Sequence, residues 1–256
     1  MNYWSEKDKL KTKAKKHTIE MEQKYSDKIK ESINTAIIYD NTLKLKNSKT
    51  LKNKSGIIFV DEIDSVTAIE KYYEKDEKIA ILNFASYKNP GGMFLQGSKA
   101  QEECLCHDSN LYNVLSNFEN TYYAWNNLHK NKALYLDRAL YTKDIIFRDK
   151  YKVDVITCAA PNKTVAQRYL RISDEENSKV LKERIRFILN IAVENDIDTL
   201  ILGAYGAGVF GQDATEVANI FKAELENDFV NSFENVVFAI IKGENYDKMN
   251  EVLKNM

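Results

Sequence analysis

Two adjacent carboxylates, Glu102 and Glu103, closely follow a glycine-rich segment in the stretch NPGGMFLQGSKAQEE. The backbone N–H groups of Gly91 and Gly92 can point the same way and bind an anion without a lysine. A carboxylate beside a bound phosphate feels like-charge repulsion, which raises its pKa and suits it to general acid catalysis. The structural alternative is that both carboxylates complement the dipole of a helix N-terminus, which lowers the pKa. The sequence leaves both interpretations open.

A second glycine-rich segment, GAYGAGVFG at 203–211, lies between an apolar run and a predicted helix start near Asp213. The first segment has the same setting, because it connects a predicted strand that ends near Phe84 to a predicted helix start at Ser98. Loops that run from strand ends into helix N-termini are where open α/β sheets bind phosphates. If the two strands are neighbours, the loops converge. Two such loops predict a diphosphate and hence a nucleotide-like substrate, and Phe210 is an aromatic candidate for packing against it.

Other interpretations of the glycines are weaker. Gly206, Gly208 and Gly211 match G-x-G-x-x-G, but a dinucleotide-binding fold needs this motif near the start of a βαβ unit, and only one predicted strand follows it here. The sequence G-x-x-x-x-G-K-[ST] of phosphate-binding loops is absent. Glycines that serve only tight turns are a further alternative, which is less convincing for both segments together than for either alone.

No residue cluster indicates a metal or a cofactor. Cys104, Cys106 and His107 form C-x-C-H, which lacks the spacing of zinc sites and has no second ligand pair elsewhere. We interpret them as half-buried helix residues. The chain has only three histidines, and none belongs to a recognisable Ser–His–Asp or Cys–His arrangement. We therefore expect neither a metal nor a cofactor.

The segments that must position these residues alternate between apolar, β-branched runs and helical patterns. Such alternation predicts an α/β fold with a sheet covered on both faces. The predicted strands are 35–40, 56–61, 78–84, 152–159, 199–204 and 235–242. The predicted helices are 65–74, 99–117, 119–130, 174–195, 214–229 and 246–255. The segment 131–150 has no clear period and is expected to be an extended insertion or a hairpin.

Three sequence pairs have the spacing of a capping box at a helix N-terminus. They are Ser98 with Gln101, Ser173 with Glu176, and Asp213 with Glu216. At residues 1–34, apolar residues spaced by three and four among charged ones predict an amphipathic helix packed on the domain. No repeat or linker divides the rest. We therefore predict a helical extension at 1–34 and one domain at 35–256.

Composition excludes several kinds of partner. The net charge of −1 gives no electrostatic basis for sequence-specific binding to duplex nucleic acid. The longest apolar run, Val236 to Ile241, is too short to span a bilayer, and the first residues lack the apolar core of a secretory signal. Three cysteines in such a chain are typical of reduced thiols. We expect a cytoplasmic protein without a membrane partner.

Residues 81–112, ILNFASYKNPGGMFLQGSKAQEECLCHDSNLY, resemble the signature of the microbial-type poly(ADP-ribose) glycohydrolases, members of the macrodomain superfamily. In that family a PGGG loop precedes a QEE catalytic loop. FRD at 147–149, AAPN at 159–162 and LGAYGAGVFGQD at 202–213 are similar to further family motifs. The resemblance covers roughly residues 55–242.

The resemblance implies a three-layer α/β/α macrodomain with a mixed sheet. Such a domain binds ADP-ribose, or an ADP-ribosylated macromolecule, and hydrolyses the glycosidic bond at the distal ribose without metal. By position, Glu103 matches the catalytic acid, and Glu102 matches the residue that orders the ribose hydroxyls. Phe210 matches the aromatic residue on the distal ribose, and the substrate diphosphate would hold the attacking water. The implied substrate-binding residues are Asn83, Asn89, Gly91, Gly92, Gln101, Gly206, Ala207, Gly208, Val209 and Phe210.

One position departs from the family pattern, since Met93 stands where PGGG has its third glycine. If this position needs a positive φ or a close approach to phosphate, methionine costs binding and turnover. Two alternative functions remain open: an ADP-ribose reader without catalysis, and a hydrolase of mono-ADP-ribosyl groups. Met93 favours the reader, and the intact Gln101, Glu102 and Glu103 disfavour it.

Overall fold

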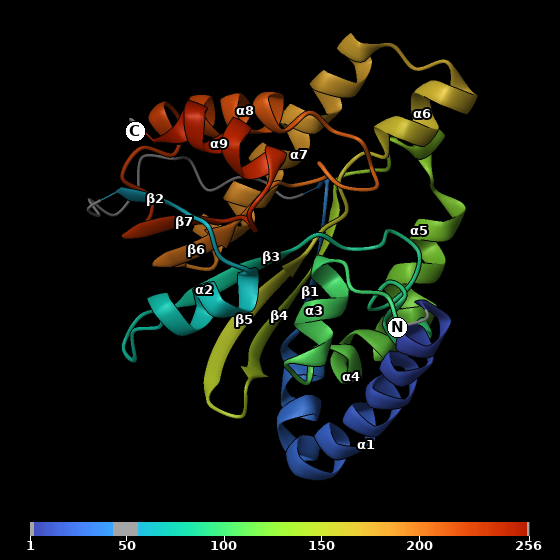
Figure 1. Cartoon of the computed structure of the whole chain (residues 1–256). Helices are drawn as coiled ribbons and strands as arrows, with labels where there is room; N and C mark the ends of the chain where they lie inside the picture. Colours follow the sequence, from blue (N-terminus) through green and yellow to red (C-terminus); the bar gives the residue numbers. More distant parts are fainter. Residues whose placement is uncertain (1–2, 43–55, 255) are drawn as a thin grey trace.

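One mixed sheet forms the centre of the molecule (Figure 1). In the computed structural model, which describes residues 3–42, 56–254 and 256, seven strands take the order β1-β4-β5-β3-β6-β7-β2. β4 pairs antiparallel with β1 and β5, whereas β5, β3, β6, β7 and β2 run parallel to one another. The strands are β1 (Ile37–Asp40), β2 (Ile57–Asp61), β3 (Ile79–Asn83), β4 (Arg138–Phe147), β5 (Tyr151–Thr157), β6 (Thr199–Leu202) and β7 (Asn235–Ala239).

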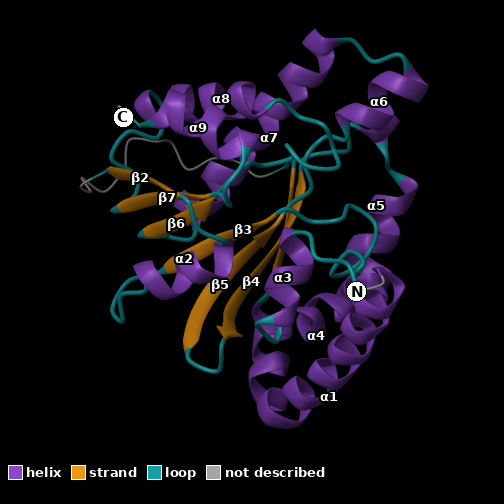
Figure 2. Cartoon of the chain, in the orientation of Figure 1, coloured by secondary structure: helices purple, strands orange, loops and turns teal. Residues whose placement is uncertain are grey.

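Helices cover both faces of this sheet (Figure 2). On one face lie α7 (Asp174–Glu194), α8 (Ala214–Glu226) and α9 (Glu244–Leu253). On the other lie α1 (Tyr3–Thr35), α2 (Ser65–Tyr72), α3 (Gln101–His107) and α4 (Leu111–Leu115). Because side chains alternate along a strand, Leu82 of β3 packs in the first core and Ile81 in the second. The expected three-layer α/β/α fold is confirmed.

The long N-terminal helix α1 is amphipathic and packs on the second face of the sheet. Its side chains Ala14, Met21 and Ile29 are buried. Its backbone also approaches the first glycine segment closely, because a Cβ atom at Gly97, where φ is +79°, would lie 2.5 Å from the carbonyl oxygen of Lys7. Gly97 therefore serves the contact with α1. In the part of the chain that is described, we find no helix with the length and apolarity required to cross a membrane.

The prediction of a single helix at 99–117 is wrong, because the helix is interrupted between α3 and α4. Ser109 satisfies the backbone at the break: its hydroxyl donates to the carbonyl oxygen of Leu105 (2.6 Å) and accepts from the N–H of Leu111 (3.1 Å). The capping box at Ser98 is also wrong. Helix α3 begins after Ala100 without a side-chain cap, and Gln101 turns toward β3 instead.

The other two capping boxes are confirmed at their first residues. The Ser173 hydroxyl accepts from the N–H of Glu176, and Asp213 accepts from the N–H of Glu216. The helix predicted at 119–130 is a π-helical turn (Glu119–Tyr123) followed by α5 (Ala124–Leu128).

The segment 131–150 contains β4, which forms a hairpin with β5. One further helix, α6 (Lys163–Leu170), is absent from the sequence prediction although its start is marked by Asn162, whose side chain accepts from the N–H of Val165. Residues 1–2 and 255 of the predicted helices lie outside the described residues.

Candidate active site

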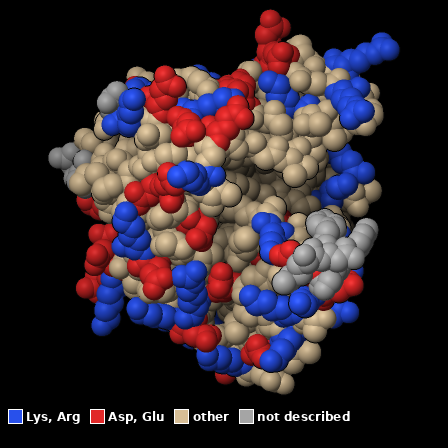
Figure 3. Space-filling view, in the orientation of Figure 1, with Lys and Arg blue, Asp and Glu red and all other residues tan. Residues whose placement is uncertain are grey.

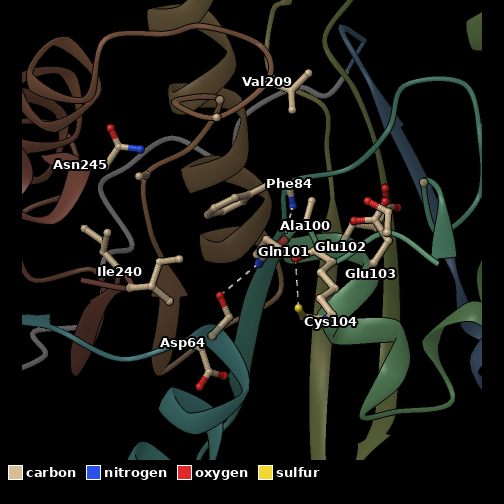
Figure 4. A pocket seen from close by; sticks show the side chains of 18 of the residues that line it. Asp64, Phe84, Ala100, Gln101, Glu102, Glu103, Cys104, Val209, Ile240 and Asn245 are labelled. Atoms are coloured by element: carbon tan, nitrogen blue, oxygen red, sulfur yellow. Dashed lines mark hydrogen bonds between the residues drawn. The ribbon is translucent and has the colours of Figure 1, made fainter. Parts of the chain in front are cut away.

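The two glycine-rich segments converge because β3 and β6 are neighbouring parallel strands. Both segments leave the carboxyl ends of these strands and border one cavity of about 770 Å³. Figure 4 shows the carboxylates of Glu102 and Glu103 at one end of this cavity and Ile240 and Asn245 at the other, with Phe84 between them. In the space-filling view the molecule is hollowed between the two helical layers (Figure 3).

Glu102 is buried and held on both carboxylate oxygens. Its Oε2 accepts from the backbone N–H of Ser86 (2.6 Å) and its Oε1 from the side-chain amide of Asn83 (3.2 Å). The pKa of Glu102 is raised to about 8, mainly by burial and to a lesser extent by the neighbouring Glu103. The hydrogen bonds from Ser86 and Asn83 act in the opposite direction. The sequence left open whether the pKa of this carboxyl is raised or lowered. Burial, which the sequence could not reveal, raises it.

Glu103 has one fixed oxygen and one unpartnered oxygen. Its Oε1 accepts from the backbone N–H of Met93 (2.8 Å), and its Oε2 has no hydrogen-bond partner among the described residues. The side chain is only 5% exposed, yet it lines the cavity. A carboxyl group that is anchored at one oxygen and unengaged at the other has the geometry of a positioned proton donor.

Glycine is required at position 92 by both carboxylates. The φ of Gly92 is +59°, and a Cβ atom there would lie 2.6 Å from Oε1 of Glu103 and 2.9 Å from Oε2 of Glu102. Gly91 also has a positive φ, of +65°, and a Cβ there would meet the ring of Tyr112 at 2.7 Å. The first segment and the carboxylate pair are therefore packed as one unit.

The N–H groups of the first segment are engaged within the protein. Gly92 donates to the carbonyl oxygen of Asn89 (3.1 Å), and Met93 donates to Glu103. The N–H of Gly92, which was expected to bind an anion, is thus engaged within the loop itself. In the second segment, the N–H groups of Gly208, Val209 and Phe210 have no partner within the described part of the chain.

Met93 does not strain the loop. Its φ is −109° and its ψ is 30°, a conformation that any L-residue adopts, so the third glycine of the family motif is not needed here for its backbone freedom. The Met93 side chain is 47% exposed and lies beside the cavity.

The second segment combines one constrained glycine with an open tip. Gly206 has a φ of +74°, and a Cβ there would lie 2.8 Å from side-chain atoms of both Ala160 and Gln212. At Gly208 a Cβ would meet nothing within 4 Å, and Val209 is 86% exposed. Both line the cavity, as does Phe210.

Four other predicted site residues take supporting positions. Asn83 is fully buried behind Glu102, with its amide shared between Glu102 and Thr157. Gln101 borders the cavity, but its amide bonds to the N–H of Phe84 and the carbonyl oxygen of Leu82 and thereby fastens the start of α3 to the end of β3. Asn89 borders the cavity. Ala207 accepts a hydrogen bond at its carbonyl oxygen from the Asn245 side chain (3.3 Å).

The sequence analysis missed the far wall of the cavity. It is formed by Phe84, by Asp64 before α2, and by residues 239–245 between β7 and α9. The signal that could have found the last segment is its position after a strand parallel to β6, since such strands end at the same edge of the sheet. Among the described residues, no group of three or more His, Cys, Asp or Glu side chains could hold a metal ion.

Comparison with known proteins gives a consistent result. Residues 7–149 match the family described as the microbial-type PARG (poly(ADP-ribose) glycohydrolase) catalytic domain. The poly(ADP-ribose) glycohydrolase of Thermomonospora curvata is 28% identical, with a TM-score of 0.84 over 95% of this chain and 99% of that one. The enzyme of Deinococcus radiodurans in complex with ADP-ribose is 32% identical, with a TM-score of 0.79 over 89% of this chain and 98% of that one. No curated protein matches the sequence.

The fold and the buried carboxylate pair between two strand-end loops define a glycohydrolase catalytic domain of the three-layer α/β/α type. The family match spans more than half of the chain. The chain belongs to the microbial-type poly(ADP-ribose) glycohydrolase catalytic domain family.

Proposed function

We propose that this chain hydrolyses the glycosidic bond at the terminal ribose of poly(ADP-ribose), with Glu103 as the general acid. The observation that carries the proposal is the asymmetric setting of Glu103, which lines the cavity with Oε1 fixed by the Met93 N–H and with Oε2 buried and unpartnered among the described residues. The bound ADP-ribose in the Deinococcus enzyme, and the inhibitor ADP-HPD in the Thermomonospora enzyme, support ADP-ribose as the ligand.

The substrate diphosphate would bind the second glycine-rich segment. The N–H groups of Gly208, Val209 and Phe210 have no partner among the described residues and lie at the cavity, and successive N–H groups of this kind bind anions. The distal ribose would then lie between Phe210 and the carboxylates, and the base would lie toward Phe84 and Ile240, whose side chains offer an apolar surface.

In this arrangement the protonated Glu103 donates its proton to the leaving oxygen as the ribose C–O bond breaks through an oxocarbenium-like state. Water then adds to the same ribose carbon and loses a proton to the Glu103 carboxylate, which restores the acid. A diphosphate held by the second segment is the group that would position this water.

Glu102 is suited to a different role. Its pKa of about 8 keeps the carboxyl largely neutral near pH 7, so it cannot take a proton from water but can hydrogen-bond the ribose hydroxyls. Asn83 and Ser86 hold this carboxyl in place. We therefore propose that Glu102 orients the ribose and that Asn83 and Gln101 support the pair from behind.

The setting of Met93 weakens the main argument for a reader without catalysis, because its ordinary φ removes the expected strain.

We also propose, as the arrangement supported by the packing of α1, a macrodomain at 35–256 with a helical extension at 1–34. The free thiols of Cys104, Cys106 and Cys158 support a reducing compartment such as the cytoplasm, with ADP-ribosylated macromolecules as partners.

The test is to incubate the purified protein separately with poly-ADP-ribosylated and mono-ADP-ribosylated protein and to measure released ADP-ribose by chromatography. We expect release from the polymer. Release from the mono-ADP-ribosylated protein alone would replace the proposal with a mono-ADP-ribosyl hydrolase. Binding of ADP-ribose without release from either conjugate would identify a reader.

A further inference from the structure

Three aromatic rings connect the two loops of the site, and of these only Phe210 borders the cavity. The rings of Tyr87 and Tyr135 stack, with centroids 4.0 Å apart and planes 11° from parallel. Tyr135 in turn meets the ring of Phe210 edge to face, at 6.1 Å and 61°. Tyr87, Tyr135 and Ala159 form a small buried cluster of their own, against which Phe210 packs.

At one end of this aromatic series, Tyr87 is rigidly fixed. It follows Ser86, whose N–H holds Oε2 of Glu102. The Tyr87 hydroxyl donates to the carbonyl oxygen of His129 (2.9 Å), and its own carbonyl oxygen accepts from the amide of Asn126 (3.0 Å). The Tyr87 ring is therefore fixed in place, and Tyr87 directly follows Ser86, whose N–H positions Glu102.

In the middle, Tyr135 occupies an unfavourable backbone conformation. Its φ is +62°, in the left-handed region, which is rare for a bulky residue. Backbone bonds enforce it: the Tyr135 N–H donates to the carbonyl oxygen of Lys130 (3.2 Å), and its carbonyl oxygen accepts from the amide of Asn131 (3.0 Å). Strain of this kind persists only where the surroundings over-determine it, and it gathers near functional sites.

At the other end, Phe210 is partly buried and follows an exposed loop tip with little packing of its own. A Cβ atom at Gly208 would have no neighbour within 4 Å, and Val209 is almost fully exposed. The Phe210 ring lines the cavity, whereas Tyr135 does not. Phe210 also packs against the first core, so the edge contact with Tyr135 is one of the restraints on the orientation of its ring.

We infer that Tyr135 is a positioning residue that sets the Phe210 ring relative to Glu102 by stacking on Tyr87. This inference rests on the proposed function, because it assumes that Phe210 contacts the ribose. The stacked rings carry the effect, so phenylalanine at position 135 should serve nearly as well as tyrosine. Loss of the Tyr135 ring should loosen Phe210 and weaken binding of ADP-ribose, although Tyr135 itself does not touch the ligand.

The experiment compares ADP-ribose affinity, by calorimetry, and hydrolysis of poly(ADP-ribose) in four variants of the full chain. Asparagine tolerates a left-handed φ, so Tyr135→Asn removes the ring without adding backbone strain, and Tyr135→Leu is a second ring-free variant. We expect both to raise the Kd by roughly 3- to 10-fold, the effect of losing one aromatic pair, and Tyr135→Phe to stay within about 2-fold of the parent. Tyr141→Leu is the matched control, because Tyr141 is buried in β4 and does not border the cavity.

A double-mutant cycle with Phe210→Leu separates positioning from general destabilisation. If Tyr135 acts through Phe210, Tyr135→Asn should change the Kd little once Phe210 is leucine. Independent, multiplying effects of the two changes would overturn the inference, and so would a Tyr141→Leu variant that loses affinity to the same extent. A parent protein that neither binds ADP-ribose nor cleaves the polymer would instead refute the proposed function.

Discussion

The backbone N–H of Met93 donates to Oε1 of Glu103 at 2.8 Å. The residue that departs from the glycine pattern of the family thus fixes the proposed acid through its main chain, which any residue type except proline can do. The other carboxylate oxygen, Oε2, is buried without a hydrogen-bond partner among the described residues. The loop and the acid are in this way one geometric unit, and changes in either should be felt by the other.

Glu103→Gln should abolish most hydrolysis and spare binding. The glutamine oxygen can still accept from Met93, so the loop keeps its shape, but the amide cannot deliver a proton. We expect the rate of ADP-ribose release to fall by about 10²-fold or more, the usual contribution of general acid catalysis. Calorimetry should give an ADP-ribose Kd close to that of the parent. Hydrolysis at the parental rate would show that the acid lies elsewhere.

Met93→Gly should not improve the enzyme. Because the φ of Met93 is −109°, glycine relieves no strain, and the N–H that holds Glu103 is present in both residues. We expect kcat and Kd within about 3-fold of the parent and a free energy of unfolding lower by about 0.5–1 kcal/mol, since glycine gains more entropy on unfolding. A large gain in turnover would mean that the methionine side chain obstructs the substrate.

Alanine at two glycines should give opposite results. At Gly92, the Cβ would come within 2.6 Å of Glu103 Oε1 and the φ is left-handed, so Gly92→Ala should displace both carboxylates and reduce activity by about 10²-fold. At Gly208 a Cβ has open space, so Gly208→Ala should fold normally and keep most activity. Thermal unfolding of the two variants checks the fold. Equal activities would contradict the geometry.

Gly208→Val should block binding at the unengaged loop donors while leaving stability unchanged. The branched side chain would project into the cavity beside the N–H groups of Val209 and Phe210. We expect ADP-ribose binding to be lost in calorimetry, with a melting temperature near that of the parent. Parental affinity would place the diphosphate away from the second segment.

Glu102→Gln should change how stability depends on pH. The pKa of Glu102, about 8 in the folded protein, lies above its ordinary 4.5, so the folded state binds more protons than the unfolded state between these values. The free energy of unfolding of the parent therefore falls as the pH rises through this window. The glutamine variant does not titrate at this position, so its free energy of unfolding should exceed that of the parent at about pH 8.5 by about 1 kcal/mol or more, with the gap closing near pH 5.

The same variant has a structural reason to fold. Asn83 Oδ1 has no hydrogen-bond partner among the described residues, so rotation of the Asn83 amide would let it accept from the new side-chain N–H₂ group. Hydrolysis and affinity should both fall moderately, as expected for loss of ribose positioning. A stability difference that is the same at both pH values, measured by denaturant unfolding, would argue against a buried, neutral Glu102.

The sequence was sufficient to place the two glycine-rich segments at strand ends, and it predicted that they meet on the condition that the two strands are neighbours, which the structure shows them to be. It could not predict the state of Glu102, which depends on its burial and on Asn83 and Ser86, brought to it by β3. It also assigned the N–H groups of Gly91 and Gly92 to a ligand, whereas in the folded loop the N–H of Gly92 donates to the carbonyl oxygen of Asn89.

The wall of the cavity at Ile240 and Asn245 escaped prediction for a different reason. No local motif marks it, and it reaches the site only because β7 lies beside β6 in the sheet. The break between α3 and α4 was hidden as well. The Ser109 hydroxyl replaces the missing helical hydrogen bonds of the backbone. The spacing of apolar residues does not reveal such a bond between side chain and backbone.

Gly97 allows the N-terminal helix to pack directly against the first glycine-rich loop. Because Gly97 has no side chain, the backbone of α1 at Lys7 contacts directly the segment that leads into α3, which carries Glu102 and Glu103. Phe94 and Leu105, from the same loop and helix, share a core with Ala14 and Ile29 of α1. A chain shortened to begin at residue 36 would therefore lose the surface on which its own active-site loop is built, and α1 is better regarded as a brace than as an appendage.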